Sequence, residues 1–562
     1  MTRTFPLLLA VACAPPPSDS ADTDVAADTD SAPTSDTADS DTDPPADTGD
    51  TDDTDAPAGP GRPTSCGALT APFTDCAVGL SPAQTTLPPS LKVAPHTDAL
   101  VADLDEDGWL DVCASRFPGP LTCWRDAGGL TFTTPPTTLT EGASFGSVAT
   151  DLDGDGHVDV AVLDVPVPED GDLSGLTVRL RILKGKGDGT FDDITEAAGL
   201  GQLPPPGCDD IAPAGLSVLH LDGDGRLDLV VRMTGTCRPY VYKGKPNTRW
   251  ERSISTLTAP VETGLLTFDL DRDGHLDLFA YSFGEPASSY YKGKDGTFTA
   301  TALAPPFTGA KVTSPMGCGA GDIDGDGLLD VYCSDHGHQT LLKLDSQGQA
   351  FDVTAAQGAA VPTTLGGEDP ISWAALVVDL DGRDGPDLVS PSAFEAVSET
   401  WDQELLVLLQ GSDGRFTRQT SGPLGAPAQE RGMVLADFDG NTCPDLLLLP
   451  ADFQAPGAPL RLLLGAGCTH PFGGVTVLGA NGQEAVGATL TARWADDSVG
   501  AWRVTKTGGY AGVGPAQVWP SPRVPGTALA EATLYWTDGS TSAVTAADLA
   551  AGLVRQPAPG GP

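Results

Sequence analysis

Short apolar runs recur along the chain from about residue 64 to residue 470, and acidic or glycine-rich residues separate them. Clear examples are 158–163, 276–281 and 328–332. Apolar runs of this length, bounded by Gly, Asp and Pro, are typical of buried β-strands. The 68 glycines and 50 prolines among the 562 residues favour many turns over long helices. The pattern therefore predicts an all-β chain.

A third strand, a tight turn and a fourth strand follow each of the clearer apolar runs. The turns carry Asp188-Gly189 in one repeat and Asp295-Gly296 in another. Asp-Gly between apolar runs is a strong hairpin signal because the turn requires positive φ. Segment 191–195, Phe-Asp-Asp-Ile-Thr, supplies the fourth strand and returns as 351–354. Four short antiparallel strands per repeat predict the blade of a β-propeller.

An acidic nine-residue loop joins the first and second apolar runs of each repeat. In residues 322–330, aspartates stand at positions 1, 3, 5 and 9, with Gly327 at position 6. Alternate carboxylates on a tight turn can converge on Ca²⁺, a hard cation with six to eight oxygen ligands. The glycine allows positive φ. Four loops are complete: Asp103, Asp105, Asp107 and Asp111; Asp151, Asp153, Asp155 and Asp159; Asp269, Asp271, Asp273 and Asp277; Asp322, Asp324, Asp326 and Asp330.

Three further copies are degenerate. His220 removes the first carboxylate of one copy and leaves Asp222, Asp224 and Asp228, whereas the last copy keeps oxygen ligands at Asp437, Asp439, Asn441 and Asp445. The copy at 379–387 keeps Asp379, Asp381 and Asp387 but has Arg383 at position 5, where a cation would enter the cage, and we leave it out of the predicted ligand set. We expect four to six Ca²⁺ ions, which stabilise the fold more than they bridge to a ligand.

Seven loops with start-to-start spacings of 48, 69, 49, 53, 57 and 58 residues predict a seven-bladed propeller over residues 63–470. Segment 73–80 resembles a fourth strand, yet it precedes the first loop, and the last repeat ends after its third strand. We therefore predict that the amino-terminal segment completes the last blade and leaves no open sheet edge.

The amino terminus has the pattern of an export signal. A basic start, a short apolar run and small residues precede Cys13, so 1–12 is predicted to be a signal peptide and Cys13 a lipidation site. The alternative is an ordinary signal peptide with a coincidental cysteine, and either one exports the protein to the cell surface, the outer membrane or the medium. Residues 13–62 hold 14 aspartates and almost nothing to bury, which predicts a disordered tether.

The net charge limits the classes of partner that the protein can bind, and the cysteine content predicts its disulfides. A net charge of −46 argues against nucleic acid and anionic lipid, so contact with a membrane would come only through the lipid on Cys13. The ten other cysteines predict five local disulfides, with free thiols or a metal site as the alternative. The predicted pairs are Cys66–Cys76, Cys113–Cys123, Cys208–Cys237, Cys318–Cys333 and Cys443–Cys468.

Catalytic signatures are weak. Residues 142–146 match G-x-S-x-G, but a strand and an acidic loop follow instead of the helix that a nucleophile elbow requires. His336 and His338 form a close pair without a visible third ligand, so zinc is disfavoured. We predict no enzyme.

The acidic loops, together with Phe145-Gly146, resemble FG-GAP/VCBS repeats of integrin-α-type propellers over about 400 residues. Residues 471–555 resemble the ASPIC/UnbV domain of the cartilage acidic protein family through 508–510 and 534–539, although Thr537 replaces the usual proline. The resemblance implies calcium loops between the first and second strands of each blade and a small carboxy-terminal β domain. Residues 556–562 are predicted to be a disordered tail.

These observations predict a calcium-stabilised cell-surface binding or adhesion module for a protein or glycan ligand, with no oligomer predicted. The alternative is an extracellular polysaccharide lyase or hydrolase on the same scaffold, because fold alone does not settle function. An axial pocket lined by Arg, His and Tyr would favour the enzyme.

Overall fold

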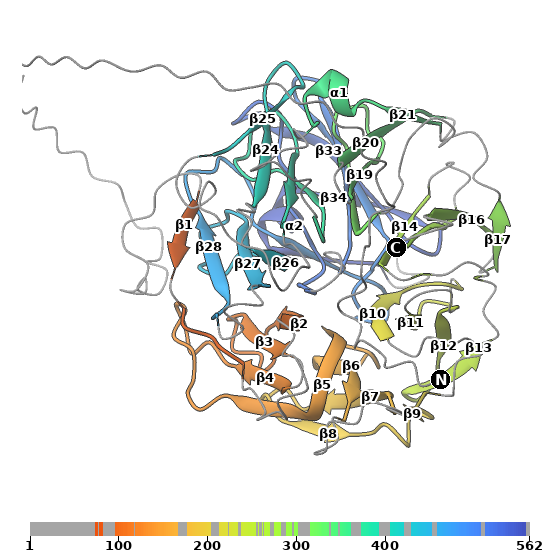
Figure 1. Cartoon of the computed structure of the whole chain (residues 1–562). Helices are drawn as coiled ribbons and strands as arrows, with labels where there is room; N and C mark the ends of the chain where they lie inside the picture. The colour runs from red at the N-terminus through yellow and green to blue at the C-terminus, as the bar shows by residue number, and fades with distance from the viewer. Residues whose placement is uncertain are drawn as a thin grey trace, which may run out of the picture.

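The computed structural model shows an all-β protein (Figure 1). The residues it describes are 73–76, 78–82, 96–116, 119–166, 177–203, 213–222, 224–233, 238–253, 257, 261, 263–269, 275–282, 288–294, 297–301, 315–335, 339–346, 349–360, 372–392, 405–420, 429–451, 458–506 and 512–557.

Small antiparallel sheets follow one another around a circle in the manner of a β-propeller (Figure 1). Five have four strands, in the orders β10-β11-β12-β13, β14-β15-β16-β17, β18-β19-β20-β21, β22-β23-β24-β25 and β1-β28-β27-β26. Their bounds are β10 (Pro213–Leu219), β11 (Asp228–Met233), β12 (Tyr240–Lys245), β13 (Arg249–Ser253), β14 (Gly264–Phe268), β15 (Asp277–Tyr281), β16 (Ser288–Lys294), β17 (Thr297–Thr301), β18 (Gly317–Gly321), β19 (Asp330–Ser334), β20 (Gln339–Leu344), β21 (Ala350–Asp352), β22 (Leu376–Val378), β23 (Asp387–Ser390), β24 (Leu406–Gln410), β25 (Phe416–Arg418), β26 (Glu430–Ala436), β27 (Asp445–Pro450), β28 (Arg461–Gly465) and β1 (Phe73–Cys76). The short helix α1 (Thr354–Gln357) follows β21.

A larger sheet spans the first two repeats. Its strands are β2 (His96–Ala102), β3 (Asp111–Arg116), β4 (Pro120–Trp124), β5 (Thr137–Thr150), β6 (Asp159–Val165), β7 (Arg179–Gly185), β8 (Phe191–Asp193) and β9 (Gly201–Gln202). The 14-residue β5 pairs with β4 near its start and with β6 from Ala143 onward, so it serves both repeats.

The Phe145-Gly146 pair lies at a register shift in β5, between Ser144 and Ser147. A Cβ on Gly146 would come within 2.5 Å of the backbone nitrogen of Leu216 in β10. Only glycine allows the two backbones to approach this closely. The glycine therefore permits close contact between the first strands of neighbouring repeats.

The amino-terminal segment closes the ring as predicted. β1 pairs with β28 in antiparallel register, with Phe73 opposite Gly465 and Cys76 opposite Leu462. An ion pair between Asp75 and the Arg461 guanidinium, at 2.7 Å, crosses the same two strands. The described residues thus cover the edge that β28 would otherwise expose.

Hydrophobic clusters lie between the faces of adjacent sheets. One cluster joins Val101 and Val112 of the first repeat to Leu447 and Leu462 of the last. Packing of this kind links each sheet to its neighbour, so the ring depends on every repeat.

Three of the predicted disulfides are confirmed: Cys113–Cys123, Cys318–Cys333 and Cys443–Cys468. Cys76 is also disulfide-bonded. Cys66, the predicted partner of Cys76, lies outside the described residues. Both cysteines of the predicted pair Cys208–Cys237 also lie outside them, as do Cys13 and the tether.

The carboxy-terminal part forms two further sheets and a short helix. The sheets are β32-β29-β35 and β31-β30-β33-β34, and their bounds are β29 (Val475–Leu478), β30 (Thr489–Trp494), β31 (Val499–Arg503), β32 (Gln517–Val518), β33 (Leu529–Tyr535), β34 (Thr541–Val544) and β35 (Leu553–Arg555), with α2 at Ala546–Ala550. Thr545 and Asp548 form a capping box that begins α2. Figure 1 shows β33, β34 and α2 within the circle of sheets.

Across the described part of the chain, every helix is too short or too polar to cross a membrane.

Ring closure should contribute measurably to stability. Phe73 is 1% exposed and packs in one cluster with Leu446, Leu448 and Leu463. We expect Phe73→Ala to lower the free energy of unfolding by about 3 to 5 kcal/mol through lost burial and a cavity. Phe351 is 51% exposed, so Phe351→Ala is a matched control that should cost less than about 1 kcal/mol. Equal losses in urea unfolding would contradict the closure.

Candidate metal centres

We number the acidic loops in chain order: loop 1 (103–111), loop 2 (151–159), loop 3 (220–228), loop 4 (269–277), loop 5 (322–330), loop 6 (379–387) and loop 7 (437–445). Where the flanking residues are described, each joins the first and second strands of its repeat, as the sequence predicts.

The aspartate at position 9 of each loop is a buried connection between strands. It is at most 1% exposed in all seven loops. In loop 5, Oδ1 of Asp330 accepts a hydrogen bond from the backbone N–H of Leu344 in the third strand at 2.8 Å, and Oδ2 accepts one from Ile323 at 3.0 Å. The same third-strand bond is made by Asp111, Asp159, Asp228, Asp277, Asp387 and Asp445.

Position 1 shapes the turn. The carboxylate of Asp322 accepts from the N–H groups of Gly325 at 2.7 Å and Gly327 at 2.9 Å. Both glycines have positive φ, 76° and 82°. Loop 7 forms the same turn with Thr442 at position 6 and φ of 71°, a conformation that is uncommon for a β-branched residue. The turn therefore forms in loop 7 although Thr442 replaces the glycine at position 6.

Five loops bring the carboxylates of positions 1, 3 and 9 together, with ligand oxygens within 4.8 Å of one another. Each cluster could hold a metal ion, and oxygen-only donors suit Ca²⁺ or another hard cation. The clusters are Asp103, Asp105 and Asp111; Asp151, Asp153 and Asp159; Asp322, Asp324 and Asp330; Asp379, Asp381 and Asp387; Asp437, Asp439 and Asp445.

Position 5 accepts a backbone hydrogen bond in the described loops, and its predicted role as a metal ligand stays a prediction. The carboxylates of Asp107, Asp155 and Asp326 accept hydrogen bonds from the backbone N–H of position 7, as does the amide oxygen of Asn441. These residues lie beside the clusters but are not members of them.

Loop 6 shows what the sequence reasoning missed. Arg383 is exposed rather than inside the cage, and Asp379, Asp381 and Asp387 converge as in the complete loops. The backbone N–H of Arg383 donates a hydrogen bond to the Asp379 carboxylate at 3.2 Å. The signal was present in the sequence, because carboxylates at positions 1, 3 and 9 suffice for the cluster whatever stands at position 5.

Loop 3 is arranged differently. Asp222, Asp224 and Asp228 do not form one of the five clusters. The buried His220 ring places Nδ1 3.0 Å from the carbonyl oxygen of Arg226 and Nε2 3.4 Å from that of Glu484. A calcium loop contributes the carbonyl of position 7 to the ion. In loop 3, the imidazole of His220 contacts this carbonyl oxygen instead.

Loop 4 is described in part. Asp269 and Asp277 lie within the described residues, and Asp277 makes its third-strand hydrogen bond, whereas Asp271 and Asp273 lie outside them.

Third-strand cations divide the loops into two groups. The ammonium of Lys184 pairs with Asp153, and with Asp155 at 2.7 Å; Lys343 pairs with Asp324; Lys243 pairs with Asp222 at 3.1 Å. Arg125 holds the same position near Asp105. The corresponding residues of loops 6 and 7 are Leu409 and Leu464. These two loops therefore receive no third-strand cation, and an added ion has less competition there.

Burial changes the acidity of the loops. It raises the pKa of Asp111, Asp159 and Asp228 to about 7 and that of Asp330 to about 8, and neighbouring loop carboxylates add to the rise. A cation among the carboxylates would oppose this effect by favouring the charged form.

The carboxy-terminal part contacts the first strand or the acidic loop of every repeat. Its donors bond mainly to backbone carbonyls: Val513 to Ala99, Lys506 to Ala149, Asn481 to Gly225, Arg503 to Thr267, and Arg523 to Ile323 and Asp384, while Ser521 donates to the Asp379 carboxylate. A Cβ on Gly512 would lie 2.6 Å from the carbonyl oxygen of Met433 in the last repeat. These contacts agree with Figure 1, in which carboxy-terminal elements lie within the circle of sheets.

The G-x-S-x-G match is structural. Ser144 is 0% exposed, and its hydroxyl donates to the buried carboxylate of Asp98. A hydroxyl held in this way is not presented to a substrate. His336 and His338 lie outside the described residues.

Comparison with known proteins identifies FG-GAP-like repeats in the chain. The family described as FG-GAP-like repeat matches residues 103–162, 220–280 and 269–333, about a third of the chain. The matches begin at or near loops 1, 3 and 4. No curated protein matches the chain.

Solved structures show weak likenesses. The BP39L lectin from Burkholderia pseudomallei is 14% identical with a TM-score of 0.42, over 66% of this chain and 96% of that one. A lectin from Agrocybe aegerita that recognises non-reducing terminal N-acetylglucosamine is 16% identical, with a TM-score of 0.36 over 60% and 85%. The biofilm matrix protein Bap1 of V. cholerae is 12% identical, with a TM-score of 0.30 over 84% and 62%. At these scores the likenesses assign no function to this chain.

Substitution can separate the structural role of position 9 from ion binding. In Asp330→Asn, the amide nitrogen would face a backbone N–H that the carboxylate now accepts, so we expect a loss of about 1 to 3 kcal/mol with or without Ca²⁺. In Asp324→Asn, the position 3 carboxylate and its ion pair with Lys343 are lost, so the stabilisation by Ca²⁺ should fall while the metal-free protein changes by less than about 1 kcal/mol. Urea unfolding in Ca²⁺ and in chelator checks both, and equal behaviour of the two variants would contradict the assignment.

The raised pKa values predict the pH dependence of the metal-free protein. An aspartate with a folded-state pKa of about 7 or 8 and an unfolded value near 3.8 favours the folded state at low pH, and this contribution is lost as pH rises through the folded pKa. We therefore expect chelator-treated protein to unfold at lower urea concentration at pH 8 than at pH 5.5. Saturating Ca²⁺ should weaken or reverse this order; a flat profile without metal would contradict the prediction.

Proposed function

We propose that the protein is an extracellular binding module that Ca²⁺ stabilises. The observation that carries the proposal is the fivefold recurrence of one carboxylate cluster, at the same three positions of loops 1, 2, 5, 6 and 7. Oxygen donors in a glycine-containing turn suit Ca²⁺ better than softer metals. FG-GAP-like repeats in the same stretch agree with this ion and with a non-catalytic binding fold.

The ions in this proposal act mainly on stability. Each cluster places carboxylates within 4.8 Å of one another, and their repulsion would open the turn unless a cation offsets it. Ion binding to the folded state alone then becomes folding free energy. Millimolar Ca²⁺ outside cells is sufficient for sites of modest affinity.

Three disulfides support an oxidising, extracellular location. We further propose that the chain is exported and anchored by a lipid on Cys13, with residues 13–62 as the spacer between membrane and ring. Residues 471–555 serve in this proposal as an ASPIC/UnbV-like domain that docks on the loop face.

The partner in this proposal is a protein or a glycan. The carboxy-terminal segment contacts every repeat from within the circle of sheets, and this weighs against an axial active site, which the enzyme alternative would use. Binding then falls to cavities beside the axis or to the outer surface.

Calcium removal tests the scaffold. At a free Ca²⁺ concentration 100 times Kd, each site should add about 2.7 kcal/mol to the free energy of unfolding. We expect chelator to lower Tm by many degrees, with recovery on adding Ca²⁺ and little recovery with equal Mg²⁺. An unchanged melt would refute the calcium scaffold. A glycan array and a protein pull-down, each with and without Ca²⁺, would then identify the partner class.

A further inference from the structure

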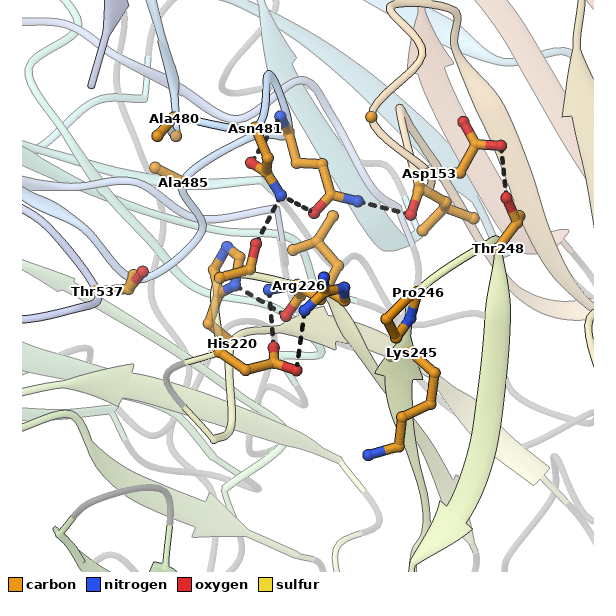
Figure 2. A pocket seen from close by; sticks show the side chains of 18 of the residues that line it. Asp153, His220, Arg226, Lys245, Pro246, Thr248, Ala480, Asn481, Ala485 and Thr537 are labelled. Carbon is orange, nitrogen blue, oxygen red and sulfur yellow. Dashed lines mark hydrogen bonds and ion pairs between the residues drawn. The ribbon is translucent and has the colours of Figure 1, made fainter. Parts of the chain in front are cut away.

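A polar cavity of about 500 Å³ lies where three parts of the chain meet. Loop 2 forms one side, loop 3 and the β12–β13 turn form another, and the carboxy-terminal turn around Asn481 forms the third (Figure 2). Its volume falls within the range of about 300 to 1,000 Å³ that small-ligand sites occupy.

Hydrogen bonds hold the three walls in fixed positions. Asn481 Nδ2 donates to the carbonyl oxygen of Gly225 at 2.6 Å, and Gln483 Nε2 donates to that of Leu152 at 2.6 Å. Thr248 Oγ1 donates to Asp153 at 2.8 Å on the opposite side (Figure 2). The cavity is therefore built between fixed elements rather than left between loosely packed ones.

The β12–β13 hairpin is basic in an acidic protein. Segment 238–252 carries five Lys and Arg residues and one Glu, in a chain with 77 acidic and 31 basic residues. Lys245, which lines the cavity, stands directly opposite Arg249 in the strand register. Among the residues that the structure describes, neither side chain makes a hydrogen bond or an ion pair. Like charges directly opposite each other are unfavourable, so the pair would be stabilised by an anion.

The other charged groups of the wall select the kind of anion. Arg226 adds the guanidinium that lines the cavity, and this group pairs with Asp224 at 3.4 Å. The carboxylates of Asp153, Asp224 and Asp538 also line the cavity; carboxylates accept hydrogen bonds from hydroxyls but repel phosphate. A ligand must therefore bring one weakly charged anionic group together with several hydroxyl donors.

A second cavity on this face is lined by a different set of charged side chains. It measures about 650 Å³ and is lined by Asp103, Asp151 and Lys506 among others. Lys506 is 3% exposed and already bonds to the carbonyl of Ala149 and pairs with Glu484 at 2.7 Å. Its charge is used inside the protein, so the exposed Arg555, which also lines this cavity, is the cation that remains there.

We propose that the cavity between loop 2, loop 3 and the Asn481 turn binds a sugar acid, a hexuronate, whose carboxylate contacts Lys245 and Arg226 while its hydroxyls donate to Asp224 and Asp538. This deepens the proposed binding function by naming a ligand class and a site. The hexuronate can be free or the end of an acidic polysaccharide; both present the same group.

Calorimetric titration in saturating Ca²⁺ tests the site. The probes are glucuronate, galacturonate and their disaccharides, with glucose as the uncharged control. We expect saturable uronate binding that is at least tenfold tighter than glucose binding and weakens with salt. Tighter binding of disaccharides than of monosaccharides would assign the source to a polysaccharide end. Equal binding of glucose, or no saturable uronate binding, overturns the proposal.

Variants locate the binding. Lys245→Gln and Arg226→Gln should each weaken uronate binding about tenfold or more with unchanged Tm. Lys186→Gln, at an exposed lysine paired with Asp192, is the matched control and should bind as the parent does. Unchanged affinity in both cavity variants overturns the site. If chelator leaves Tm unchanged while uronate still binds, the calcium scaffold fails and this inference stands. If chelator lowers Tm but uronate does not bind, the calcium scaffold stands and this inference fails.

Discussion

A buried carboxylate between two backbone N–H groups is the interaction on which each repeat depends. Burying a charge is costly unless its hydrogen-bonding capacity is met. At position 9, one oxygen accepts from the start of the loop and the other from the third strand, as Asp330 does with Ile323 and Leu344. The acidic loop is thereby tied to two strands, and positions 1 and 3 are carried to within 4.8 Å of the same carboxylate. The cluster that could hold an ion is a consequence of this strand connection.

The remaining charge must be balanced from elsewhere, and the repeats do this in different ways. Lys184 and Lys343 bring ammonium groups to loops 2 and 5. Loop 3 uses the His220 imidazole instead of a carboxylate. The carboxy-terminal part places its cations elsewhere: Arg503, Lys506 and Arg523 donate to backbone carbonyls. It docks without using most loop carboxylates, which leaves them available to ions.

The sequence was sufficient for features that repeat and for contacts within one repeat. The loop period placed the strands, the resemblance of 73–80 to a fourth strand predicted the pairing of β1 with β28, and local spacing predicted disulfides such as Cys318–Cys333. Contacts between distant segments were not predictable, because nothing in the spacing of Arg523 indicates that it reaches Ile323. The cluster in loop 6 was not predicted for another reason. Arg383 at position 5 suggested a cation inside the cage, but its side chain is exposed and the three aspartates converge.

The third repeat shows how a degenerate copy can gain a different role. It follows the longest interval between loops, it lacks the first carboxylate, and its hairpin carries the basic cluster. His220 contacts the position 7 carbonyl, so an imidazole stands at the start of this loop where the complete copies have a carboxylate. Lys245 lines the neighbouring cavity and makes no ion pair with the loop carboxylates that line it too. The departure from the repeat pattern and the cavity wall that carries Lys245 therefore lie in the same repeat.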